Sequence, residues 1–332
     1  MRYFVTGATG LVGGQVVDRL CARGETVRTL VLEAPLVDGL RRRGVEVVSG
    51  DLTDPADLAS AVAGTDVVIH CAGIVQMGAH RRDLWAVNVE GTERLLTAAA
   101  RGGSPRFVYV SSVGVYGRAP APTAEDAPKK PVGAYPESKW AAEQAVWRHA
   151  EAGLPVVVLR PCPIYGPGDR RVTRALERLG RLKVLPLPGG GRRLADLVYV
   201  SDVADAALAA ATAPAAVGRA YNVTDGERHT YRDILLAHEQ VRGRRPAIVG
   251  VPGRAVVGAL QMLMWWRQLR GVPGDWAGEV ERVRALDCDA HYSIEAARRD
   301  LGYRPRVGLV EGLRRTFGEP PAPGEARLPL QQ

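Results

Sequence analysis

The first fourteen residues constrain the fold more than any other part of the chain. A short apolar run, Tyr3–Thr6, leads directly into glycines at positions 7, 10 and 13, and apolar residues at helical spacing follow. Glycines at these places let the backbone turn tightly and approach a pyrophosphate, whose charge then lies at a helix N-terminus. A plain glycine-rich turn is the alternative, but the position between a strand and a helix favours a dinucleotide site.

The first two-thirds of the sequence alternate between short β-branched runs and amphipathic stretches. This alternation is typical of a parallel sheet with helices on both faces. Helical spacing extends from Leu11 to Leu20, with Gly24 closing that helix, from Leu84 to Leu96, and from Tyr135 to Glu151. We therefore predict an α/β fold with a doubly wound (Rossmann) parallel sheet of strand order 3-2-1-4-5-6. The predicted strands are Tyr3–Thr6, Thr26–Leu32, Val45–Ser49, Val67–Cys71, Arg106–Ser111 and Val156–Arg160.

The pattern loosens after Pro161, where prolines and the run Gly189–Gly191 predict loops, although Leu194–Val200 and Ala220–Val223 still predict strands. We expect a dinucleotide-binding domain over residues 1–165 and a smaller lobe, mainly substrate-binding, over residues 166–317. Some segments from about 195 to 235 are expected to return to the first domain. The Pro-rich residues 318–332 are expected to form a flexible tail.

The charged residues are biased in kind rather than in position. The 44 basic residues include only four lysines and, against 36 acidic residues, give a net charge of +8. The arginines are scattered, and Arg41–Arg43 is expected at an exposed helix end, so we expect no nucleic-acid site. No apolar run reaches the roughly 18–20 residues of a membrane-spanning helix. The first strand leaves no room for a secretion signal, and the four cysteines have neither disulfide nor zinc spacing. A cytoplasmic protein with no integral membrane segment and no metal site is expected.

Residues after the second and third strands bear on the choice of dinucleotide. An acidic residue at the end of the second strand would bind a ribose 2′-hydroxyl, and an arginine would bind a 2′-phosphate. Glu33 slightly favours NAD, whereas Arg28 and the positive net charge keep NADP open. Asp51 follows the third strand, where its carboxylate can accept a hydrogen bond from an adenine amine or cap a helix before Pro55.

Tyr135 and Lys139 stand four residues apart at the start of the third predicted helix, with Pro136 just inside it. This spacing places both side chains on one helix face. A phenol normally ionises near about pH 10, and a neighbouring ammonium stabilises the phenolate, which brings the phenol within range of proton transfer. A hydroxyl partner is expected at the C-terminal end of a strand, and Ser112 is our choice. A simple turn at this serine is the alternative.

The motifs together resemble the extended short-chain dehydrogenase/reductase family, also described as the NAD-dependent epimerase/dehydratase family. They run through nearly the whole chain: TGATGLVGG at 6–14, DLTD at 51–54, HCAG at 70–73, NVEGT at 88–92, VSSVGVYG at 110–117, YPESK at 135–139 and RPCPIYGPGD at 160–169. The resemblance implies that Tyr135 is the general acid/base, that Lys139 holds the nicotinamide ribose and lowers the phenol pKa, and that Ser112 polarises the substrate oxygen. It also implies an NAD(P) site that includes Tyr135, Lys139, Gly7, Thr9, Gly10, Leu11, Val12, Gly13, Glu33, Asp51, Leu52, Cys71, Ala72, Gly73, Asn88, Pro161 and Ile164.

Within that family the chain is most similar to the 3β-hydroxysteroid (sterol) dehydrogenase-like branch, through residues 135–143, 220–227 and 292–303. The resemblance implies an oxidoreductase that interconverts a secondary alcohol and a ketone. The stretch Arg254–Arg267, apolar nearly all round, suggests a hydrophobic substrate, such as a sterol-like, polycyclic or 3-oxoacyl compound. A packed lobe core and a helix at a membrane surface are the alternatives for this stretch.

Two other functions stay open at this point. One is a nucleotide-sugar epimerase or reductase; a dehydratase is disfavoured because Val113-Gly114 stands where related dehydratases carry an Asp-Glu pair. The other is a non-catalytic cofactor-sensing protein, although such relatives commonly lack the tyrosine–lysine pair that Tyr135 and Lys139 form here.

Four further residues are expected to have roles outside the reaction. Asp196 and Asp202 are expected to be structural, because the predicted site already has its acid/base. Trp140 and Trp147 lie seven residues apart on the third helix, where they can pack internally or against another subunit. By analogy with the family, a homodimer is expected.

Overall fold

The computed structural model describes the chain except for residues 33–36, 76–79, 104–105, 272–279, 281–283 and 319–332. Its centre is a seven-stranded parallel sheet in the order β10-β6-β5-β4-β1-β2-β3. The strands are β1 (Arg2–Thr6), β2 (Thr26–Val31), β3 (Glu46–Ser49), β4 (Val67–His70), β5 (Arg106–Val110), β6 (Val156–Pro161) and β10 (Arg219–Val223). The predicted order 3-2-1-4-5-6 is confirmed, and β10 extends the sheet beside β6.

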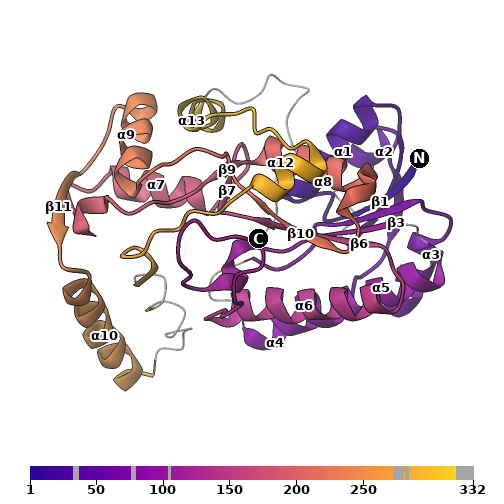
Figure 1. Cartoon of the computed structure of the whole chain (residues 1–332), viewed down its shortest axis with the longest axis horizontal. Helices are drawn as coiled ribbons and strands as arrows, with labels where there is room; N and C mark the ends of the chain where they lie inside the picture. Colours follow the sequence, from indigo (N-terminus) through magenta and orange to yellow (C-terminus); the bar gives the residue numbers. More distant parts are fainter. Residues whose placement is uncertain (33–36, 76–79, 104–105, 272–279, 281–283, 319–332) are drawn as a thin grey trace.

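Helices cover both faces of this sheet (Figure 1). One face carries α1 (Leu11–Ala22), α2 (Val37–Arg41), α8 (Val200–Thr212) and α12 (Glu295–Leu301). The other face carries α3 (Pro55–Val62), α5 (Thr92–Arg101) and α6 (Ala134–Glu151). Each face has its own cluster of buried hydrophobic side chains, so both faces of the sheet are shielded from water.

The stretch from Leu84 to Leu96, expected as one long helix, is helical but irregular. It consists of α4 (Arg81–Leu84), a π-helical turn η2 (Trp85–Gly91) and α5. A π-turn inserts an extra residue into the helical ladder, and such turns are frequent at functional sites. Here the turn contains Asn88, whose side chain is buried.

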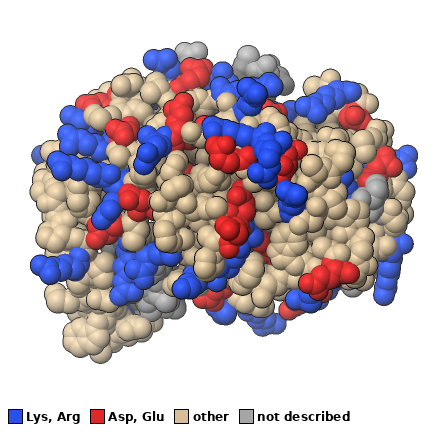
Figure 2. Space-filling view, viewed as in Figure 1, with Lys and Arg blue, Asp and Glu red and all other residues tan. Residues whose placement is uncertain are grey.

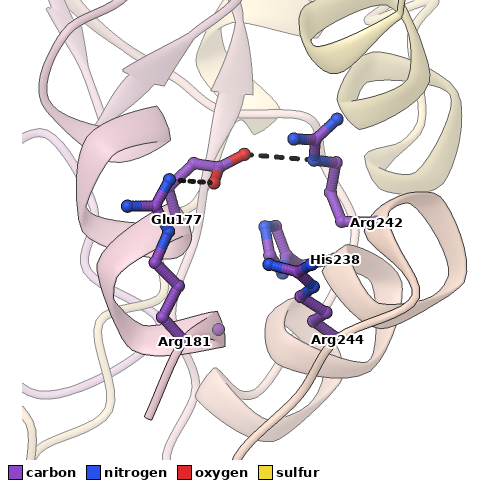
Figure 3. Close-up of a pocket in the computed structure, with 6 residues that line it drawn as sticks. Glu177, Arg181, His238, Arg242 and Arg244 are labelled. Carbon is purple, nitrogen blue, oxygen red and sulfur yellow. Dashed lines mark ion pairs between the residues drawn. The ribbon is translucent and has the colours of Figure 1, made fainter.

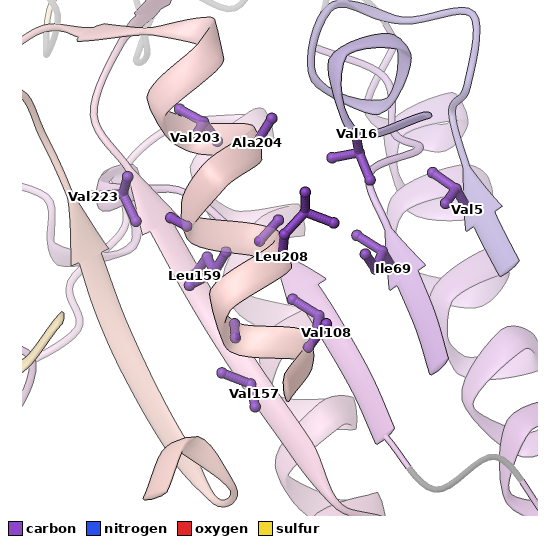
Figure 4. Close-up of a cluster of buried hydrophobic side chains, with 14 of the residues drawn as sticks. Val5, Val16, Ile69, Val108, Val157, Leu159, Val203, Ala204, Leu208 and Val223 are labelled. Atoms are coloured by element: carbon purple, nitrogen blue, oxygen red, sulfur yellow. The ribbon is translucent and has the colours of Figure 1, made fainter. Parts of the chain in front are cut away.

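Helix α8 packs closely on the sheet through small residues (Figure 4). Val203, Ala204 and Leu208 lie over strand residues such as Val108 and Leu159, and all five are buried. The chain therefore becomes helical at Val200, and the strand predicted over Leu194–Val200 is mostly wrong. Only β9 (Val198–Tyr199) forms there, paired in parallel with β7 (Ile164–Tyr165). The reason is that the alanine-rich run after Val200 buries a helical face rather than alternate residues.

The rest of the chain lies at the left of Figure 1 and has a third buried cluster. It contains α7 (Val172–Gly180), α9 (Tyr231–Arg242), α13 (Leu309–Phe317) and the parallel pair β8 (Val184–Pro188) with β11 (Ala247–Val251). Short 3₁₀ turns occur at η3 (Val113–Tyr116), η4 (Gly189–Gly191) and η5 (Pro214–Ala216). Helix α10 (Gly253–Leu269) follows β11 and projects at the lower left.

The apolar stretch Arg254–Arg267 forms most of α10, but it is not a packed core. Met264 is the one fully buried residue among those of α10 whose side chains are described, and Met262, Trp265 and Leu269 are exposed. The alternative of a packed lobe core is therefore wrong. None of the helices in the described part of the chain is long and apolar enough to cross a bilayer.

Candidate active site

The glycine loop between β1 and α1 closes on itself and on the end of β4. Gly7 has φ of +70°, and a Cβ there would lie 2.9 Å from the backbone N of Ala72. A Cβ at Gly13 would lie 2.1 Å from the carbonyl oxygen of Gly7, which also accepts a hydrogen bond from the Gly10 N–H at 2.9 Å. Only glycine fits at positions 7 and 13, so the loop keeps its backbone open to a ligand.

The N-terminus of α1 is left free for an anion. Gly10 is the N-cap and supplies no side-chain hydrogen bond, and the first turn has no acidic residue. Thr9, Leu11 and Val12 lie half-buried around this turn. Uncapped N–H groups and the positive end of the helix dipole are the features that bind a pyrophosphate. The loop and helix start therefore fit the dinucleotide predicted from the sequence.

The residues predicted on the adenosine side are only partly described. Leu52 lies in the loop between β3 and α3, and its side chain is buried. The Asp51 carboxylate accepts a hydrogen bond from the Thr53 N–H at 2.8 Å, so it orders its own turn before α3. Glu33 lies outside the described residues.

The two terminal nitrogens of Arg28 are engaged within the protein, and its Nε is buried. Its guanidinium donates to the carbonyl oxygens of Ala61 and Ala63 at 3.1 and 2.7 Å and forms an ion pair of 2.8 Å with Glu46. A guanidinium held in this way has little capacity left for a 2′-phosphate.

A chain of hydrogen bonds joins β1, β4 and the π-turn around a buried histidine. Thr6 Oγ1 lies 2.7 Å from His70 Nδ1, and His70 Nε2 lies 2.9 Å from Thr92 Oγ1. Thr92 donates to the Asn88 carbonyl oxygen at 2.6 Å, and the Ala72 N–H donates to Thr6 at 3.1 Å. Because the Thr92 hydroxyl donates its proton to the Asn88 carbonyl, it can only accept from His70. His70 therefore donates through Nε2 to Thr92 and accepts at Nδ1 from Thr6. Burial agrees with this neutral ring, since it lowers the pKa of His70 to about 3.

The Asn88 side chain ties the segment after β4 to the start of α6. Its Oδ1 accepts from the Ile74 N–H at 2.7 Å, and its Nδ2 donates to the Ile74 carbonyl and to Ser138 Oγ, both at 3.0 Å. Ser138 in turn donates to the Tyr135 carbonyl at 2.8 Å. Gly73 is packed so closely that a Cβ there would lie 3.0 Å from Asn88 Oδ1. Asn88 therefore positions both the predicted cofactor segment and the helix that carries the predicted catalytic pair.

Lys139 is buried beneath this edge of the sheet. Its Nζ donates to the Val110 carbonyl at 2.7 Å and lies 4.3 Å from the centre of the Tyr109 ring. Burial lowers the pKa of Lys139 to about 7, while nearby Cys71 and Glu143 act in the opposite direction. Burial also raises the pKa of the Cys71 thiol to about 12, so that this predicted cofactor contact is a neutral thiol.

Tyr135 lies at the start of α6, beside Ser112. Burial raises the pKa of Tyr135 above its ordinary value, whereas Arg171 and Ser112 lower it. The predicted lowering of the phenol pKa by Lys139 is not found here, because the cation that acts on Tyr135 is Arg171. The Arg171 guanidinium, 5.9 Å from the centre of the Tyr135 ring, is a cation that the sequence analysis missed.

The two adjacent serines after β5 have different partners. Ser111 is buried and donates to Glu143 Oε2 at 2.8 Å. Ser112 is half-buried, caps η3 and lies with Tyr135. Glu143 also forms a buried ion pair with Arg160, which donates to the Tyr116 hydroxyl at 2.7 Å. Ser112 is therefore the serine that faces the tyrosine, as predicted, and Ser111 belongs to the buried ionic network.

The loop after β6 has the place expected of a nicotinamide wall. Pro161 is the last residue of β6 and is buried, and Ile164 is half-buried in β7. The intervening Cys162 donates its N–H to the Val223 carbonyl at 3.0 Å, which ties the loop to β10. Both predicted residues therefore lie at the C-terminal edge of the sheet, where open α/β sheets bind ligands.

Asp196 and Asp202 hold loops together and do not face the tyrosine network. Asp196 accepts from His291 Nδ1 at 2.9 Å and from the Tyr292 N–H at 2.8 Å. Asp202 accepts from the N–H groups of residues 306 and 307, both at 3.2 Å. Their structural role was expected from the sequence.

Away from these residues, a cavity of 230 Å³ lies between the C-terminal ends of α7 and α9 (Figure 3). Glu177 pairs there with Arg181 at 3.6 Å and with Arg242 at 3.1 Å, beside His238. None of the predicted site residues lines this cavity. We assign it no part in the reaction. In the described part of the chain, no group of three or more His, Cys, Asp or Glu residues is placed to hold a metal ion.

Comparison with known proteins agrees with this geometry. The profile of the NAD dependent epimerase/dehydratase family matches residues 3–224. The chain belongs to this family. It is an NAD-dependent oxidoreductase of the extended short-chain dehydrogenase/reductase type, as its sequence motifs predicted.

The family member is similar to reductases and dehydrogenases over nearly its full length. It is 33% identical to the 2-alkyl-3-oxoalkanoate reductase of Stenotrophomonas maltophilia (strain K279a), over 95% of this chain and 98% of that protein. It is 34% identical to a 3 beta-hydroxysteroid dehydrogenase/Delta 5-->4-isomerase of Mycobacterium tuberculosis (strain ATCC 25618 / H37Rv), over 94% and 88% of the two chains. A short-chain dehydrogenase/reductase superfamily protein from Agrobacterium tumefaciens with bound NAD has a TM-score of 0.74 at 26% identity, over 95% of each chain.

Proposed function

We propose that this oxidoreductase interconverts a secondary alcohol and a ketone on a hydrophobic substrate, with Tyr135 as the acid/base. The observation that carries the proposal is that the glycine loop, Tyr135 with Ser112, and Lys139 all lie at one edge of the sheet. The glycine loop offers a cradle for a dinucleotide, Tyr135 lies beside Ser112, and Lys139 is buried one turn along α6. Bound NAD(H) would supply or accept the hydride, and the side chains would handle the proton.

In the direction of reduction, the Tyr135 hydroxyl donates its proton to the carbonyl oxygen of the substrate. Ser112 donates a hydrogen bond to the same oxygen and polarises it. Lys139 holds the nicotinamide ribose, and Arg171 opposes the effect of burial on the pKa of the phenol. In the direction of oxidation, Tyr135 takes the proton back from the alcohol.

A hydrophobic substrate is favoured by the named relatives and by the sequence. The two relatives are named for an oxoalkanoate and for steroids, both of which carry a ketone or hydroxyl on an apolar body. Val113-Gly114 after the active-site serine leaves no carboxylates for a dehydration. A nucleotide-sugar epimerase or reductase stays the second candidate, because the family is named for epimerases.

NAD is favoured over NADP as the cofactor. The one arginine that argued for a 2′-phosphate, Arg28, is occupied by Glu46 and two backbone carbonyls. We further propose a cytoplasmic homodimer that pairs through α6, by analogy with the family. Trp147 donates to Glu143 at 3.2 Å, and Trp147 and Trp140 are both half-buried, so part of each ring remains for a partner.

The test is a substrate panel with the purified full chain. Apolar 3-oxo esters and steroid ketones are offered beside UDP-sugars, each with NADH and with NADPH, and oxidation of the cofactor is followed by absorbance. Turnover of the apolar ketones, with a higher kcat/KM for NADH, is expected. Because an epimerase returns the hydride to its substrate and leaves the cofactor unchanged, the UDP-sugars are also incubated with NAD+ and their products are separated by chromatography. Conversion of UDP-sugars alone would replace this function with the nucleotide-sugar alternative, and tight NADH binding without any turnover would indicate a cofactor sensor.

A further inference from the structure

Helix α10 presents its apolar side chains away from the protein. Met262, Trp265 and Leu269 are 72%, 64% and 66% exposed, and Leu263 and Trp266 are also exposed. An ordinary surface helix turns its apolar stripe toward the core and its polar residues toward water. Contiguous exposed apolar surface of this kind marks a binding face.

Three of the exposed apolar side chains of α10 face away from its buried residue. Each residue advances the helix by about 100°. On that basis Met262, Trp266 and Leu269 lie within about 40° of the direction opposite the buried Met264. In the last half of the helix, residues 261–269, Met264 is the one buried side chain, so the apolar residues around it lie in solvent.

The charges of α10 are all positive. Arg254 and Arg267 lie on the helix and Arg270 caps it, while the segment 253–271 contains no acidic residue. The Arg270 guanidinium lies 3.7 Å from the centre of the Trp266 ring, at the end of the apolar face. Figure 2 shows this lower-left corner of the molecule as a projection without charged residues on its visible side, with basic residues above it.

We propose that α10 is a membrane-docking helix that inserts its outward face into the surface of a bilayer containing anionic lipids. Exposed Leu, Met and Trp with flanking arginines are the features of helices that lie in the headgroup region. A second copy of the chain fits less well, because two α10 helices in contact carry six arginines and no acidic residue of their own. Docking would bring the enzyme to where an apolar ketone is concentrated, but it does not depend on the proposed reaction.

The test is co-sedimentation of the full chain with vesicles of phosphatidylcholine alone and with added phosphatidylglycerol. We expect binding to the anionic vesicles that falls as salt is raised, since salt screens the arginines. The double variant M262S/L269S should lose about tenfold or more in vesicle partitioning. The control L182S removes another exposed apolar side chain elsewhere in the lobe, 45% exposed, and should bind as the unchanged protein does.

Three results would overturn the proposal. The first is that the unchanged protein sediments with neither kind of vesicle, which needs no variant to fold. The second is that M262S/L269S binds as well as the unchanged protein. The third is a concentration-dependent dimer, seen by light scattering, that M262S/L269S abolishes while vesicles remain unbound; this would make a second copy the occupant of the face.

Discussion

At the C-terminal edge of the sheet, charged and polar side chains are buried and hydrogen-bonded, whereas on α10 large apolar side chains lie in solvent. Glu143, Arg160 and His70 are each buried, and each has partners within 3.2 Å. Met262 and Leu269 are exposed. A buried polar group is costly unless it is paired, and an exposed apolar patch is costly unless something covers it. The first region is therefore complete within the chain, and the second points to a partner outside it.

The largest effect on stability is expected at the buried ion pair. Glu143→Ala removes the carboxylate that binds Arg160 and Ser111, and leaves a buried guanidinium unpaired. We expect the free energy of unfolding to fall by about 3–5 kcal/mol, measured by urea denaturation. The matched control is Arg148→Ala, which breaks the exposed pair with Glu93 and should cost under about 1 kcal/mol. Equal losses in the two variants would contradict the contrast between buried and exposed charge.

The second prediction compares two leucines in the same way. Leu159→Ala in β6 opens a cavity between the sheet and α8 and should cost about 2–5 kcal/mol. Leu269→Ala on α10 removes exposed surface only and should change the free energy of unfolding by less than about 0.5 kcal/mol. A large loss in Leu269→Ala would mean that the outward face of α10 is covered within the chain, and it would remove the basis of the docking proposal.

The smallest effect concerns the buried Lys139, whose pKa is lowered to about 7 in the folded protein. An unfolded lysine has a pKa of about 10.4. Between these values the unfolded chain holds a proton that the folded chain has lost, so stability rises with pH. We expect the unfolding free energy of the unchanged protein, minus that of Lys139→Met, to rise by about 1.4 kcal/mol per pH unit from about pH 8 to 9.5. A difference that stays flat would show that Lys139 keeps its proton when buried.

Much of the sheet half could be predicted from the sequence. The glycines that only fit without a Cβ, the β-branched runs and the spacing of Tyr135 and Lys139 are local features, and each fixes its own element. Together with the rule that parallel crossovers are right-handed, they determine the strand order. Ser112 could be chosen because strand ends in such sheets lie at the ligand edge.

What could not be predicted depends on contacts between distant segments. The hydrogen bonds of His70 join three elements, and Arg171 lies over Tyr135 from a different part of the chain. The HCAG and RPCPIYGPGD motifs contained or adjoined these residues but gave them no role. The apolar composition of α10 was evident, yet whether that surface was covered depended on which side of the helix met the lobe.

The central claim is that the phenol of Tyr135 moves the proton in a reaction whose hydride travels on the nicotinamide. Tyr135→Phe keeps the ring and removes the hydroxyl that lies beside Ser112. The control Tyr3→Phe makes the same change far from the site. The direct measurement is kcat for ketone reduction, together with the NADH dissociation constant for both variants. The account predicts that kcat falls about 10²–10⁴-fold in Tyr135→Phe alone, with NADH binding unchanged. Ketone reduction at an undiminished rate in Tyr135→Phe would contradict it.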